Sequence, residues 1–121
     1  MTKLEALTNS RDMWVWLAQH PKKSKQDYFT YIKLSSYFRP ENNCYLCEYT
    51  QPSSKPIPTA CNTCPLTGKW VPGIYGFASC ELQGSPYWQW FVESNNPIWA
   101  WRIVQLLNTE INNLSGFSYQ V

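Results

Sequence analysis

Residues 96–116 read NPIWAWRIVQLLNTEINNLSG and form the clearest helical pattern in this chain of 121 residues. Asn96-Pro97 supplies a cap followed by a first-turn proline, whose missing N–H would have no partner there in any case. Hydrophobic side chains then recur at helical spacing, with Val104 beside them: Ala100, Ile103, Leu107, Ile111 and Leu114. Ser115-Gly116 ends the pattern. We therefore expect a helix about 27 Å long at 1.5 Å per residue.

Two further helices are predicted from the same kinds of signal. Ser85-Pro86 starts a short helix that runs through Glu93. At the other end of the chain, Thr2 and Glu5 are spaced as a capping box, and His20-Pro21 stops the run that follows. The hydrophobic residues of this N-terminal run repeat at helical spacing: Leu4, Leu7, Trp14, Leu17 and Ala18. A lone histidine at a helix end, such as His20, is expected to cap the helix rather than to bind metal.

Four cysteines between these helices are spaced as a metal site. Cys44 and Cys47 form one C-x-x-C pair, and Cys61 and Cys64 form a second. Two such turns can direct four thiolates at one tetrahedral centre, which predicts one Zn²⁺ per chain, although an Fe–S cluster would use the same ligands. The fifth cysteine, Cys80, is either a further ligand or a buried thiol. Disulfides and a redox-active pair are the weaker alternatives for a chain with no secretion signal.

The fold class predicted from these segments is α+β in a single domain, 1–121. A helical part, 1–39, precedes a zinc-binding section, 40–84, and C-terminal helices occupy 85–121. Within the middle section, prolines exclude regular structure over 50–58, and glycines separate short apolar pieces after Cys64. Trp70-Val71 and Ile74-Tyr75 suit short strands of a hairpin beside the zinc. The zinc would stabilise a core that a chain of this length holds only marginally.

Composition limits the compartment and the chemistry. The sequence contains no apolar run of membrane-spanning length and no secretion signal, so we expect a cytoplasmic protein with no membrane partner. It also lacks a phosphate-binding glycine loop, a nucleophile elbow, and the acid that a zinc deaminase places before its cysteines. A four-cysteine site is closed to substrate. We therefore expect no catalytic residues and no enzyme activity.

The charge is small and uneven. The formal net charge is +2, with +4 in residues 1–39 and −2 in residues 40–121, and four thiolates with one Zn²⁺ would bring the total near zero. Proteins that hold nucleic acid usually carry a stronger basic footprint. A nucleic-acid-binding, zinc-ribbon-like module remains the alternative function, and its candidate contacts are the basic residues of the first part: Lys22, Lys23, Lys25, Lys33 and Arg39.

Aromatic residues make up 17% of the chain and charged residues only 15%, which favours a sticky surface. Trp14 and Trp16, like Trp99 and Trp101, are two positions apart, so the two members of a pair cannot both face the core of one helix. One tryptophan of each pair is thus a candidate anchor for a protein partner, because tryptophan is enriched at interface hot spots. A homodimer through the long C-terminal helix is compatible with this prediction.

Several short motifs carry a family resemblance, and they extend over residues 14–90. They are Trp14-Val-Trp16-Leu17-Ala-Gln-His-Pro21, then Lys25, Asp27 and Tyr28, then Cys44-x-x-Cys47-Glu48-Tyr49, Cys61-x-x-Cys64-Pro65-Leu66, Trp70, Cys80 and Trp90. In these the chain resembles a family of small phage- and prophage-encoded proteins. The resemblance implies a viral accessory protein that acts inside a bacterial host cell, with the cysteines holding a metal. We therefore expect a zinc-stabilised accessory protein that binds and modulates a host or defence protein.

Overall fold

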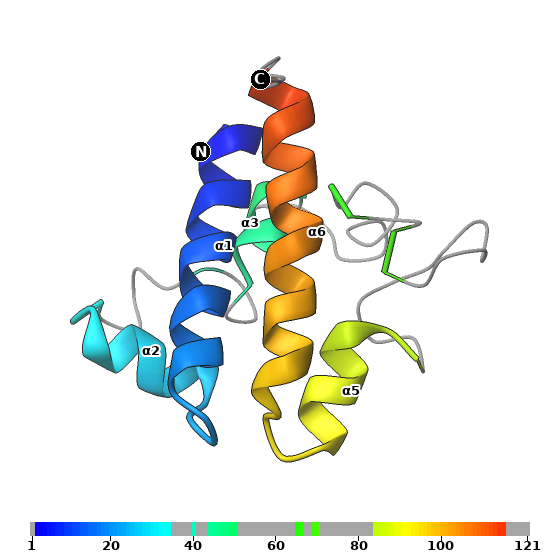
Figure 1. Cartoon of the computed structure of the whole chain (residues 1–121). Coiled ribbons are helices and arrows are strands. Elements are labelled where there is room, and N and C mark those ends of the chain that lie inside the picture. Colours follow the sequence, from blue (N-terminus) through cyan, green and yellow to red (C-terminus); the bar gives the residue numbers. More distant parts are fainter. Residues whose placement is uncertain are drawn as a thin grey trace.

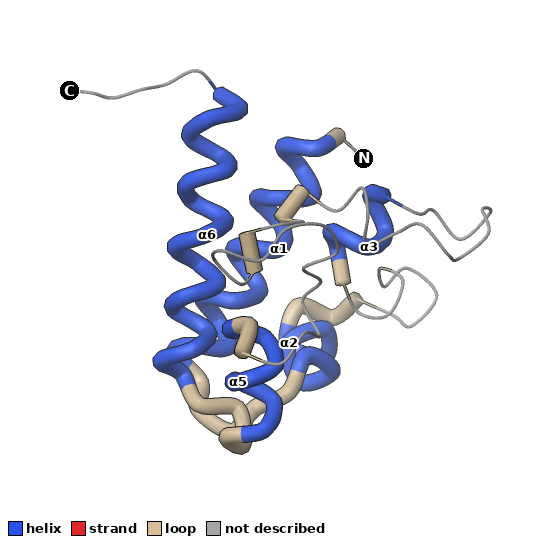
Figure 2. The backbone as a smooth tube through the Cα atoms, turned by 90° about the vertical axis from the view of Figure 1, so that its right-hand side faces the viewer, coloured by secondary structure: helices blue, strands red, loops and turns tan. Residues whose placement is uncertain are grey.

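The computed structural model describes residues 2–34, 40, 44–50, 65–66, 69–70 and 84–115. Within these residues the chain forms five helices, whose bounds are α1 Lys3–Gln19, α2 Lys25–Tyr31, α3 Tyr45–Thr50, α5 Pro86–Val92 and α6 Pro97–Ser115. The two long helices, α1 and α6, run antiparallel and pack along each other (Figure 1). The shorter helices surround this pair: α3 packs on α1, α2 lies at the end of α1, and α5 lies beside the start of α6 (Figure 2).

Side-chain caps explain where α1 and α2 begin. The Thr2 hydroxyl accepts the backbone N–H of Glu5 at 3.0 Å, and the Glu5 carboxylate accepts the N–H of Thr2 at 2.7 Å. Ser24 and Asp27 repeat this capping box at the start of α2. The predicted N-terminal helix is therefore confirmed. The residues after Ser24 also start a helix, because both halves of a capping box are present there.

The two C-terminal helices also begin where the sequence predicts. The Ser85 hydroxyl accepts the Trp88 N–H at 3.1 Å, with Pro86 in the first turn of α5. The Asn96 side chain accepts the Ile98 N–H at 3.1 Å at the start of α6. Each contact satisfies a backbone donor that the first helical turn leaves without a partner.

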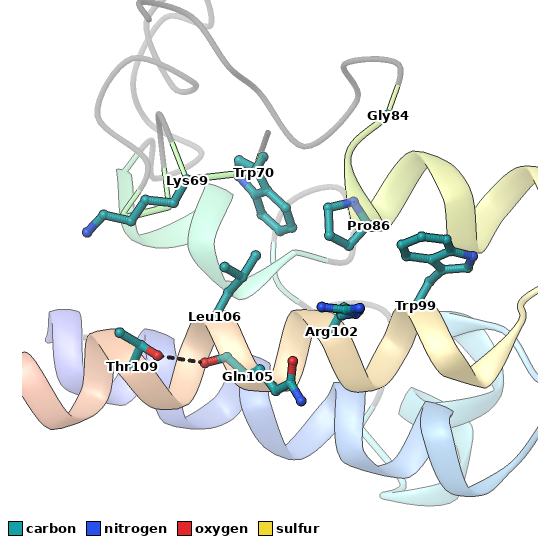
Figure 3. Close-up of a pocket in the computed structure, with 9 residues that line it drawn as sticks. All are labelled: Lys69, Trp70, Gly84, Pro86, Trp99, Arg102, Gln105, Leu106 and Thr109. Carbon is teal, nitrogen blue, oxygen red and sulfur yellow. Dashed lines mark hydrogen bonds between the residues drawn. The ribbon is translucent and has the colours of Figure 1, made fainter. Parts of the chain in front are cut away.

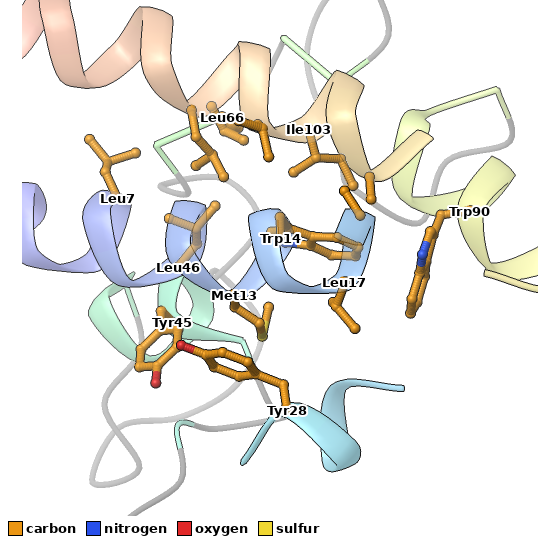
Figure 4. Close-up of a cluster of buried hydrophobic side chains, with 14 of the residues drawn as sticks. Leu7, Met13, Trp14, Leu17, Tyr28, Tyr45, Leu46, Leu66, Trp90 and Ile103 are labelled. Atoms are coloured by element: carbon orange, nitrogen blue, oxygen red, sulfur yellow. The ribbon is translucent and has the colours of Figure 1, made fainter. Parts of the chain in front are cut away.

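The core forms where side chains of α1, α2, α3, α5 and α6 meet, together with Leu66 (Figure 4). On α6 the predicted apolar face is buried at four positions: Ala100, Ile103, Val104 and Leu107. Leu114, predicted on that face, is 44% exposed, and Leu4 of α1 is 41% exposed. Both lie at the end of the α1–α6 pair near the chain termini (Figure 1), so the hydrophobic periodicity extends further than the packing does.

The predicted α+β class is wrong for the part of the chain that the structure describes, which is helical and has no strand or sheet. The stretch after Cys44, expected to be a metal-binding turn in a loop section, instead forms α3. The physical reason is local, because the Cys44 sulfur accepts the N–H of Cys47 and so caps the helix as a serine would. Trp70, expected in a strand, lies in a bend. The other residues of the expected hairpin, 71–76, lie outside the described residues.

Candidate protein-docking site

Cys44 and Cys47 sit at the start of α3 with their sulfurs held by short-range contacts. The Cys47 N–H donates to the Cys44 sulfur at 3.3 Å, and both cysteines are half-buried thiols. The pKa of the Cys44 thiol is lowered to about 6, chiefly by a hydrogen bond from the Cys47 side chain, with burial opposing and the Lys25 ammonium assisting. A thiol with a lowered pKa is a good metal ligand because the thiolate is the species that binds.

The other candidate zinc ligands, Cys61, Cys64 and Cys80, lie outside the described residues. Within those residues no three His, Cys, Asp or Glu side chains gather closely enough to hold a metal ion. His20 lies at the end of α1, where its Nδ1 is 2.8 Å from the Trp16 carbonyl oxygen. This contact is made at the C-terminal end of α1, where a side chain can hydrogen-bond one of the last carbonyl groups of the helix. The geometry of Cys44 and Cys47 fits half of a thiolate site, and the Zn²⁺ stays a prediction.

The lysines do not form one stripe in the described part of the chain. Lys25 is half-buried, and its ammonium lies 4.4 Å from the Tyr87 ring centre and 5.5 Å from that of Trp14. Lys22 and Lys23 are exposed before α2, whereas Lys33 is exposed after it. Arg39 lies outside the described residues. The basic groups are thus divided between the two ends of α2, and one of them is held by aromatic rings.

The four candidate tryptophans have different environments. Trp14 is 4% exposed and packs edge-on against Trp90, with ring centres 4.9 Å apart. Trp16 is partly buried and stacks on His20 at 4.2 Å. Trp99 is partly buried, whereas Trp101 is 42% exposed. In each pair, one tryptophan is more accessible than its neighbour two positions away, as the helical period requires.

The largest exposed hydrophobic side chains near Trp101 lie on both sides of the turn between α5 and α6. Phe91 is 68% exposed and Val92 50% at the end of α5, and Ile98 is 62% exposed at the start of α6. We call Phe91, Val92, Ile98 and Trp101 the corner patch. Ile98 and Trp101 are three positions apart on a helix and therefore share a face. Of these four residues, only Trp101 is among the anchor candidates predicted from the sequence. The missed signal is the pair of apolar residues placed directly before a polar turn.

Hydrogen bonds hold the α5–α6 turn beside the loop between α1 and α2. The Asn95 side chain donates to the Lys23 carbonyl at 2.9 Å, and the Asn96 side chain donates to the Glu93 carboxylate at 2.9 Å. Ser94 and Asn95 both adopt positive φ, which a tight reversal between two helices requires. The backbone of Lys23 therefore lies beside the α5–α6 turn, and neither Lys23 nor Lys22 is ion-paired within the described residues.

A cavity of about 290 Å³ also lies along α6, and none of the corner-patch residues lines it (Figure 3). Residues of α6 line one side: Trp99, Arg102, Gln105, Leu106 and Thr109. Lys69, Trp70, Gly84 and Pro86 complete the lining. The spacing of the α6 residues places most of them in one stripe down the helix.

Comparisons with known proteins give no relative: no family model, no curated protein and no solved structure matches this chain. The resemblance to phage-encoded proteins therefore rests on its short motifs. Of the helices that the structure describes, none combines the length and the apolar character needed to cross a bilayer.

Proposed function

We propose that this chain is a binding protein that docks another protein through the corner patch. The observation that carries the proposal is the exposure of four large hydrophobic side chains around one turn, three of them half exposed or more. Single exposed hydrophobic residues are common on protein surfaces, whereas several gathered at one place mark interaction sites. Trp101 supplies the residue type that most often anchors an interface.

Burial of these side chains would supply the driving force for docking. Removing a Phe, Ile or Val side chain from water contributes about 1.5–3 kcal/mol. Because association itself costs several kcal/mol of translational and rotational freedom, the patch needs most of its members in contact. Two hydrogen bonds, made by the side chains of Asn95 and Asn96, hold the turn between Val92 and Ile98. Less conformational freedom of this turn is therefore lost when a partner binds.

The surrounding charges favour a partner with acidic groups next to an apolar surface. The exposed Lys22 and Lys23 belong to the loop whose backbone Asn95 contacts, and Glu93 is the acidic residue of the α5–α6 turn. Opposite charges at an interface rim raise the association rate more than the affinity. On the strength of the sequence resemblance, we propose a host or defence protein as the partner. The division of the lysines between the two ends of α2 disfavours nucleic acid, which needs a continuous basic track.

Affinity capture from a bacterial host lysate tests the proposal. The tagged protein is compared with Ile98→Asp/Trp101→Glu and with Leu114→Asp, which alters an exposed leucine at the far end of the same helix. We expect a specific partner to be retained by the parent and by Leu114→Asp but lost from the corner variant. Equal retention by all three would contradict the proposal. A captured component that nuclease removes would support the nucleic-acid alternative instead.

A further inference from the structure

The cavity beside α6 combines flat apolar walls with one available positive charge. Its walls are the indoles of Trp70 and Trp99, the ring of Pro86 and the side chain of Leu106, which come from three separate parts of the chain (Figure 3). Trp70 is buried and Trp99 is half-buried. Such walls offer a flat ligand ring extensive contact, because aromatic pairs stack with an offset or meet edge-to-face.

The polar groups of the cavity differ in what they already contact. The Lys69 ammonium pairs with the Glu110 carboxylate at 2.6 Å, so its charge is neutralised. The Thr109 hydroxyl donates to the Gln105 carbonyl at 3.0 Å. Arg102 forms no ion pair within the described residues, and it lines the cavity together with Trp99 and Pro86 (Figure 3). One uncompensated guanidinium on an apolar wall is a site for one anionic group, since its N–H fork matches a carboxylate.

We propose that this cavity binds an aromatic monocarboxylate, with the ring against the tryptophans and the carboxylate on Arg102. The size supports one ring system, because about 290 Å³ lies at the small end of ligand pockets. The charge supports a monoanion. A phosphate ester dianion would need a second cation, and Lys69 of the cavity lining is already paired with Glu110. The carboxylate could belong to a free aromatic acid or to the C-terminal aromatic residue of a polypeptide.

Binding of 1-naphthylacetate, followed by the indole N–H signals in two-dimensional NMR, tests the proposal. We expect saturable shifts of the Trp99 and Trp70 signals, and at least tenfold weaker binding of the neutral 1-naphthylacetamide. Arg102→Gln should weaken naphthylacetate binding at least tenfold. Arg11→Gln, at a half-buried arginine on α1 that pairs with Asp12 and does not line the cavity, should leave it unchanged. Arg102 is exposed, so its replacement should preserve the fold, which unchanged shifts elsewhere would verify.

Three results would overturn the proposal: no shift at millimolar ligand, equal binding of acid and amide, or tenfold tighter binding of 1-naphthyl phosphate. Comparison with N-acetylphenylalanine distinguishes the two sources of the carboxylate. Tighter binding of that amino-acid derivative than of naphthylacetate supports a polypeptide C-terminus, and weaker binding supports a free acid. A neutral corner-patch variant, Phe91→Ser/Val92→Ser, adds no charge near Arg102 and changes no residue of the cavity lining. It should bind naphthylacetate normally, which separates this proposal from the docking function.

Discussion

The ammonium of Lys25 lies 4.4 Å from the centre of the Tyr87 ring, which joins the first turn of α2 to the first turn of α5. Tyr87 also meets Trp14 edge-on at 6.0 Å, so three helices converge on one aromatic cluster. A cation above a ring is attracted by the negative face of the π system. Lys25 thus has a structural role, although its sequence neighbours Lys22 and Lys23 suggest a solvated basic loop.

Replacement of Lys25 by methionine should destabilise the protein by about 1 kcal/mol, because the cation–π contacts are lost while the aliphatic stem is largely kept. Urea unfolding followed by circular dichroism measures the change. Lys23→Met, at an exposed lysine two positions earlier, is the matched control and should change the free energy of unfolding by less than about 0.5 kcal/mol. Equal effects of the two replacements would show that the ring contacts add no stability.

Two leucines of α6 should respond very differently to truncation. Leu107 is fully buried, so Leu107→Ala should cost about 2–5 kcal/mol through lost burial and the cavity left behind. Leu114 lies two turns further along the same helix and is 44% exposed, so Leu114→Ala should cost less than about 1 kcal/mol. Thermal and urea unfolding measure both. A large cost at Leu114 would mean that the apolar face predicted from the sequence is buried along its whole length.

Asp27 should make the stability depend on pH in the acid range. Hydrogen bonds from the Ser24 backbone and hydroxyl, with a smaller effect of the Lys23 charge, hold the pKa of the Asp27 carboxyl below its ordinary value. Folding therefore favours the ionised form, and this stabilisation is fully present above about pH 5 and is lost as the pH falls through the folded-state pKa.

The Asp27→Asn variant should be less stable than the parent at neutral pH, and its stability should fall less steeply in acid. Unfolding free energies measured between pH 2 and 7 check both effects. Ser24→Ala, which removes one of the hydrogen bonds to the carboxylate, should flatten the same part of the profile. Parallel profiles for the parent and Asp27→Asn would rule out this carboxylate as a source of the acid sensitivity.

Metal analysis tests the predicted thiolate site. Protein purified without added metal should contain about one Zn²⁺ per chain, and Cys44→Ser/Cys47→Ser should lose it, because two of four thiolates are removed. Loss of the metal should also lower the thermal midpoint, since metal binding contributes to folding. Cys80→Ser tests whether Cys80 replaces one of the four ligands or is a buried thiol, because only the loss of a ligand would reduce the bound metal. A parent protein free of metal would refute the site.

Helix starts could be predicted from the sequence because each depends on residues within a few positions. The side chains of Thr2, Ser85 and Asn96 accept local backbone N–H groups, and all three helices begin there. Pro86 and Pro97 leave one fewer donor in the first turns of α5 and α6. The helix after Cys44 was missed for a related reason. The Cys44 sulfur accepts the Cys47 N–H and caps the helix, a role that the C-x-x-C spacing does not reveal. The α+β class depended on that section and was wrong.

The sequence by itself determined the local signals, which are the caps, the stops and the faces of α1 and α6, because hydrogen bonds and helical periodicity act over short separations. Only the tertiary structure decided which face of each helix is covered by a neighbouring helix. It buried Trp14 and left Trp101 accessible, placed Lys25 on the Tyr87 ring, and exposed Phe91 and Ile98 around one turn. Burial depends on contacts between segments far apart in the chain, and a linear pattern contains no information about their distance.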